Sequence, residues 1–123
     1  MIQVLIKRDQ TGQIRGFIVQ GHAGYDAHGR DIVCAAVSAV AQTAVLGLRE
    51  VLHLSIQLRT REGYLSCQLP GRLSPDVVRE AQVLLETMLV GIRDIQTGYP
   101  GFVEVKVSGK GVKEDDEPST LCS

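Results

Sequence analysis

An uncharged, alanine-rich segment from Ile32 to Leu48 is the feature that most restricts how this chain can fold. Such a segment has to be buried against other elements of a domain or placed in a membrane. Alanine and leucine favour a helix, and Asp31, directly before the segment, is of a residue type preferred at a helix N-cap. We therefore predict a helix from about Ile32 to Leu52 that forms the central and most buried element of the fold.

A membrane-spanning role for this helix is disfavoured. The uncharged segment is near the lower limit of length for crossing the hydrocarbon core, and its Ser, Gln, Thr and Ala residues weaken its hydrophobicity. Asp31 and Arg49 also bracket the segment closely. We therefore expect a buried core helix and no membrane partner.

Length, charge and cysteine content limit the class of protein further. The chain has 123 residues, enough for one compact domain with its own core. Its formal net charge of −1 offers no basic surface for a phosphate backbone, so we do not expect direct binding of nucleic acid. The three cysteines are an odd number in a chain whose first residues do not resemble a signal peptide, which favours free thiols and a cytoplasmic location.

Alternating apolar and polar residues predict strands on both sides of this helix. A second helix should begin at Ser74-Pro75, because serine can cap a helix and proline suits its first turn. Its apolar residues recur at helical spacing, so this helix should be amphipathic and lie on the surface. The predicted strands are Met1–Lys7, Gln13–Gln20, Leu54–Arg59, Tyr64–Leu69 and Val103–Val107.

The element order ββαββαβ is not an alternation of single strands and single helices. It predicts an α+β fold in which two helices pack against a mostly antiparallel five-stranded sheet. The domain should span residues 1–108. Residues 109–123 include an acidic run and carry few apolar side chains, so we expect them to form a disordered C-terminal tail.

Two residues near the start of the first predicted helix, His22 and Cys34, suit thiol chemistry. Cys34 falls in the first predicted turn, where unpaired N–H groups and the positive end of the helix dipole favour a thiolate. The same N–H groups are natural donors to the oxyanion formed during peptide hydrolysis. His22 lies in the glycine-rich loop before the helix, from which it could approach the sulfur as a base and then as an acid.

Supporting roles are open for two neighbours of Cys34. Asp31 could orient the imidazole of His22, although an N-cap role would already occupy its carboxylate. Ser38 lies one turn after Cys34 on the same helix face. Its hydroxyl could contact the sulfur or the substrate, or it could bond back to the Cys34 carbonyl.

A metal site is one alternative, because His22, His28 and Cys34 are all of ligand type. Their spacing fits no compact zinc pattern, so no metal and no cofactor is expected. A non-catalytic protein-binding module is another alternative, in which Cys34 would be a structural cysteine of a core helix. Alkylation of one thiol much faster than the others near neutral pH would favour the enzyme.

The sequence GHA at residues 21–23, followed by GRDIVCAAVS at residues 29–38, resembles the signature of the ribosomal-processing cysteine proteases. The resemblance is strongest over residues 21–38, and the layout of elements extends it to about Val107. It implies a bacterial cytoplasmic homodimer that removes the short N-terminal extension of a large-subunit ribosomal protein, bL27. It also implies that His22 and Cys34 are the catalytic residues. The binding-module alternative would then be a ribosome-associated protein.

Overall fold

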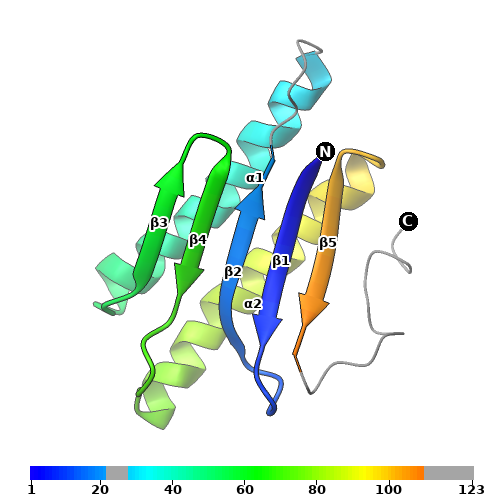
Figure 1. Cartoon of the computed structure of the whole chain (residues 1–123). Helices are drawn as coiled ribbons and strands as arrows, with labels where there is room; N and C mark the ends of the chain where they lie inside the picture. Colours follow the sequence, from blue (N-terminus) through cyan, green and yellow to red (C-terminus); the bar gives the residue numbers. More distant parts are fainter. Residues whose placement is uncertain (22–27, 110–123) are drawn as a thin grey trace.

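The centre of the fold is a five-stranded sheet with the spatial order β3-β4-β2-β1-β5 (Figure 1). The computed structural model describes residues 1–21 and 28–109, and for residues 28–31 it describes the backbone alone. The predicted tail, 109–123, lies outside the described residues except for Gly109. The strands are β1 (Ile2–Arg8), β2 (Ile14–Gln20), β3 (Gln57–Arg61), β4 (Tyr64–Gln68) and β5 (Val103–Ser108).

Strand pairing in this sheet is mostly antiparallel. β1 pairs with β2, β2 with β4, and β4 with β3, all in antiparallel register. β5 runs parallel to β1 at the edge of the sheet. The element order and the strand directions confirm the predicted α+β fold.

Two helices cover one face of the sheet (Figure 1): α1 (His28–Leu46) and α2 (Pro75–Gly98). A short π-helical stretch, η1 (Gly47–Val51), continues α1. In β1, in β5 and from Phe17 to Val19 of β2, every second residue points toward the helices, as the alternation in the sequence predicts. These inward residues form the core together with the helices, and they include Ile2, Val4, Ile6, Phe17, Val19, Val103, Val105 and Val107.

Helix α2 begins and packs as predicted. Ser74 is its N-cap, and the Ser74 hydroxyl accepts a hydrogen bond from the Val77 N–H at 3.3 Å. Arg8 of β1 donates two hydrogen bonds to the Glu86 carboxylate, at 2.6 and 3.0 Å, which ties this helix to the sheet. The buried side of the helix is made by Ala81, Leu85, Met88, Leu89 and Ile92.

Helix α1 begins earlier than predicted. Its first residue is His28 rather than Ile32, so Asp31 lies inside the helix and is not its N-cap. Among residues 28–31 only Gly29 is a very poor helix former, and extending an existing helix by one turn costs little compared with nucleating one. The predicted N-cap role of Asp31 was therefore wrong.

Strand β3 begins later than predicted, at Gln57 rather than Leu54. The Leu54 N–H donates to the Leu48 carbonyl at 3.0 Å, which ties the chain to the end of η1 and not to another strand. Leu54 and Ile56 still pack against the core. Their alternation in the sequence therefore reflects burial without strand pairing.

Helix α1 is not the most buried element, contrary to the prediction. An inner stripe of Val33, Val37 and Ala41 is fully buried against the sheet. Ile32 and Leu46, in contrast, are 58% and 48% exposed. The reason is the two-layer architecture, in which the helices cover the sheet on one side and face outward on the other.

The helical stretch Ile32–Val51 is long and apolar enough to cross a membrane by length and composition, with a mean hydropathy of 1.7. The core helix of a globular domain meets the same criteria. In this fold the inner stripe of α1 packs on the sheet, which agrees with the predicted core role.

The end of β2 is held against its neighbours at Gly21. This residue has φ +84°, a left-handed conformation that side chains with a Cβ rarely adopt. Its N–H donates to the Gly63 carbonyl, between β3 and β4, at 3.0 Å. A Cβ at position 21 would lie 2.6 Å from the Met1 carbonyl oxygen. Segments from three parts of the chain therefore meet at the residue directly before His22.

Gly21→Ala should destabilise the domain more than Gly12→Ala. Both glycines have positive φ, but a Cβ at Gly12 would meet nothing within 4 Å. We expect Gly12→Ala to lower the free energy of unfolding by about 1–2 kcal/mol through backbone strain. The clash with Met1 should add roughly 1–3 kcal/mol for Gly21→Ala. Urea unfolding of both variants measures the difference, and equal losses would show that the Met1 carbonyl moves aside without cost.

Candidate active site

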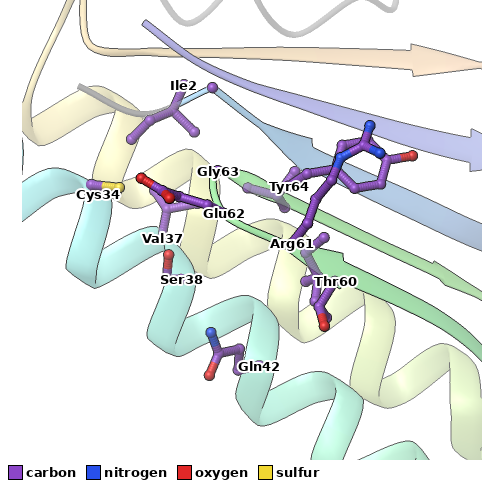
Figure 2. A pocket seen from close by; sticks show the side chains of 13 residues that line it. Ile2, Cys34, Val37, Ser38, Gln42, Thr60, Arg61, Glu62, Gly63 and Tyr64 are labelled. Atoms are coloured by element: carbon purple, nitrogen blue, oxygen red, sulfur yellow. The ribbon is translucent and has the colours of Figure 1, made fainter. Parts of the chain in front are cut away.

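A groove of about 280 Å³ opens between α1 and the hairpin formed by β3 and β4 (Figure 2). One wall is α1, a second is the hairpin turn, and the floor comes from the ends of β1 and β2. The described lining consists of Ile2, Val19, Gly21, Cys34, Val37, Ser38, Gln42, Thr60, Arg61, Glu62, Gly63, Tyr64 and Leu65. We call this cavity the α1–hairpin groove.

Cys34, Ser38 and Gln42 all line this groove from α1. They are spaced by four residues, so they form one stripe along the helix. Cys34 is a free, partly exposed thiol. Among the residues that the structure describes, the Ser38 hydroxyl has no hydrogen-bond partner, so it is not bonded back to the Cys34 carbonyl. The predicted shared face of Cys34 and Ser38 is therefore confirmed.

Cys34 lies deeper in the helix than predicted, because α1 begins at His28. Only the first four N–H groups of a helix lack partners within it, and Cys34 comes after them. The influence of the helix dipole also falls off within the first turn. The expected first-turn position of Cys34 was wrong, and its N–H is not a free oxyanion donor in this helix.

The other predicted site residues fall on segments that the structure does not describe in full. His22 lies outside the described residues, although Gly21, to which it is covalently joined, lines the groove. For Asp31 and His28 the backbone places both residues in α1. The catalytic role of His22 and the supporting role of Asp31 therefore stay predictions.

Cys67 is buried, whereas Cys34 is partly exposed. Cys67 lies on β4 opposite Phe17 of β2, within the core. Burial raises the pKa of the Cys67 thiol to about 11. At neutral pH this cysteine is therefore a neutral thiol within the core. Cys122 lies outside the described residues.

A metal site is not formed by the described side chains. Among residues 1–21 and 32–109, no group of three or more His, Cys, Asp or Glu side chains is placed to hold a metal ion. The suggested ligands His22 and His28 are not part of that set. The argument from spacing against zinc therefore stays a prediction.

The groove also contains residues that the sequence did not single out. Gln42 continues the stripe of Cys34 and Ser38, and helical spacing could have found it. Thr60 and Glu62 come from the β3–β4 hairpin. The sequence predicted a strand on each side of this turn, but no local pattern indicated that the turn would lie beside α1.

Comparison with known proteins also indicates a cysteine protease. The sequence profile of the family Cysteine protease Prp matches residues 1–104. The ribosomal processing cysteine protease Prp of Bacillus subtilis (strain 168) is 36% identical over 107 residues, which cover 85% of this chain and 96% of that protein. The protein of the same name from Staphylococcus aureus (strain Mu50) is 34% identical over 102 residues, covering 80% of this chain and 92% of that one.

Solved structures share the fold. The essential ribosomal processing protease Prp from S. aureus, in complex with a covalently linked product peptide, has a TM-score of 0.75 and 27% identity over 88% of this chain and 100% of that chain. The same protein in complex with a substrate peptide gives a TM-score of 0.76 and 26% identity over the same shares. With a profile match over nearly the whole described domain and relatives above 30% identity, this chain belongs to the Prp family of ribosomal processing cysteine proteases and is itself a cysteine protease.

Proposed function

We propose that this protease removes the N-terminal extension of the large-subunit ribosomal protein bL27 with Cys34 as nucleophile and His22 as base and acid. The observation that carries the proposal is the partly exposed Cys34 thiol in the α1–hairpin groove, which is also lined by Gly21, the residue preceding His22. The S. aureus relative forms complexes with a substrate peptide and a covalently linked product peptide. The enzyme would act in the bacterial cytoplasm.

The proposed reaction is acyl transfer through a thioester. The Cys34 thiolate attacks the scissile carbonyl, and His22 protonates the amine that leaves. Water then hydrolyses the acyl-enzyme, with His22 acting as the base. The Ser38 hydroxyl, which has no hydrogen-bond partner among the described residues, is a candidate donor to the sulfur or the substrate. Asp31 is a candidate to orient His22.

The dimensions of the groove suit an extended peptide. From Cys34 to Gln42 the helix rises about 12 Å, at roughly 1.5 Å per residue. An extended peptide advances about 3.3 Å per residue, so about three or four substrate residues fit along this stretch. The partly exposed Leu65 in the lining favours apolar substrate side chains there.

Substitution of the predicted catalytic pair should separate a dyad from a metal site. We expect Cys34→Ala to abolish cleavage of the bL27 precursor and His22→Ala to reduce it on the order of a hundredfold or more. His28→Ala should change the rate little, and chelators should not inhibit. Mass measurement of the product, with and without chelator, tests each variant. Collapse of both histidine variants together with stoichiometric zinc would refute the dyad.

Thiol reactivity should separate an enzyme from a binding module. At pH 7–8 we expect iodoacetamide to modify Cys34 much faster than the other two cysteines. Cys67 should react only after unfolding, because it is buried and its pKa is about 11. Peptide mapping after timed labelling measures the three rates. Three similar rates would favour a non-catalytic module in which Cys34 is structural.

We also propose a homodimer formed through the outer surface of the helices. A groove of about 430 Å³ lies between α1 and α2. It is lined by Ala39, Val40, Thr43, Ala44, Leu84, Thr87, Met88 and Gly91. Val83 and Val90 on α2 are 62% and 67% exposed beside it, and exposed apolar patches of this kind mark interaction sites.

Val90→Asp should therefore weaken self-association, because it buries a charge in the proposed interface. Ser108→Asp adds the same charge at an exposed position of β5 and serves as the control. Sedimentation equilibrium over a range of concentrations measures the dissociation constant, which should rise at least about tenfold for Val90→Asp alone. A wild-type protein that stays monomeric at all concentrations would refute the homodimer.

A further inference from the structure

Two charged residues, Arg61 and Glu62, line the described part of the α1–hairpin groove, and they point in different directions (Figure 2). The Arg61 guanidinium lies over the Tyr64 ring, with Cζ 4.5 Å from the ring centroid. The Glu62 side chain reaches from the turn toward α1 at Cys34 and Val37 (Figure 2). Of the two charged side chains described in this groove, the carboxylate and not the guanidinium therefore faces Cys34.

The backbone that carries Glu62 is held from several sides. Glu62 and Gly63 form the turn between β3 and β4, and Gly63 has φ +71°, which suits a tight turn. The Gly63 carbonyl accepts the hydrogen bond from the Gly21 N–H. Pairing of Arg61 with Tyr64 closes the hairpin on the other side. The turn is therefore a fixed part of the groove wall.

Glu62 has no ion-pair partner among the described side chains. The ion pairs in the described part of the chain join Arg8 to Glu86, Arg49 to Glu50 and Arg79 to Asp76. Arg61, the nearest cation in sequence, is held on Tyr64 instead. With respect to the described side chains, the carboxylate is thus available to a cation that enters the groove.

We infer that Glu62 binds a cationic group of the peptide substrate within about three residues of the scissile bond, a length set by the groove. The cation is a Lys or Arg side chain or the α-amino group of the peptide. This inference rests on the proposed use of the groove for peptide substrates and adds a selectivity to it.

Charge-matched peptides test this assignment. A peptide that spans the cleavage site is made with Lys or norleucine at each position within three residues of the scissile bond, and with a free or an acetylated N-terminus. For wild type we expect one Lys position, or the free amine, to raise kcat/KM about two- to fivefold, mainly through KM, as an exposed ion pair would. The Lys dependence and the acetylation dependence separate the two sources of the cation.

The quantity compared is the ratio of kcat/KM for the preferred charged peptide to kcat/KM for its neutral counterpart. Glu62→Gln should bring this ratio close to one. Glu62→Lys should reverse the preference, in favour of a peptide with Glu at the same position. Raising the salt concentration should also reduce the ratio, because an exposed ion pair is screened. Glu80→Gln, on the exposed side of α2, is the matched control and should keep the wild-type ratio. A Glu62→Gln variant that cleaves all peptides more slowly by one common factor would show a structural role and overturn the inference.

Binding measurements keep this test independent of catalysis. Fluorescence anisotropy with Cys34→Ala and with Cys34→Ala combined with Glu62→Gln gives dissociation constants for the same labelled peptides. Loss of the charge preference in the second protein alone supports the inference even if the wild type cleaves none of them. Equal affinities of the Cys34→Ala protein for charged and neutral peptides, or no binding of either, would overturn it. Cleavage by the wild type without any charge dependence would leave the protease function standing and refute only the role of Glu62.

Discussion

Burial of one stripe of α1 against the sheet fixes the rotation of that helix about its axis, and so decides where each of its other side chains points. Val33, Val37 and Ala41 are fully buried and recur every four residues. One residue turns a helix by about 100°, so Cys34 and Ser38 lie on the flank next to the buried stripe. That flank faces the β3–β4 hairpin and lines the groove. The core therefore positions Cys34, the proposed nucleophile, because burial of Val33 fixes the orientation of the residue that follows it.

Much of the fold follows from local patterns, whereas the full groove does not. Strand alternation and helical spacing are properties of neighbouring residues, so the element order and the shared face of Cys34 and Ser38 were predictable from sequence. The turn at Glu62 and Gly63 was predictable as a turn. Its place beside α1 depends on the pairing of β4 with β2, which brings the hairpin to one side of the helix. Such pairing is decided by tertiary packing and not by local preference.

The start of α1 shows why a cap residue alone predicts a helix boundary poorly. Asp31 has the right chemistry for an N-cap, but the helix continues upstream to His28 because one more turn costs little. The consequence is chemical as well as structural. Cys34 gains no free N–H groups and little of the dipole from its position. A cysteine nucleophile is commonly activated by an adjacent base, which is the role predicted for His22.

Helix α1 presents separate flanks to its two proposed partners. Cys34 and Gln42 line the groove on the side of the hairpin, whereas Val40 and Thr43 line the groove toward α2. Among the described residues, none lines both cavities, and the body of a helix about 10 Å in diameter separates them. A second copy seated between α1 and α2 would therefore leave the peptide groove open. Any influence of dimerisation on cleavage would have to pass through a shift of α1 as a whole, because no described residue contacts both partners.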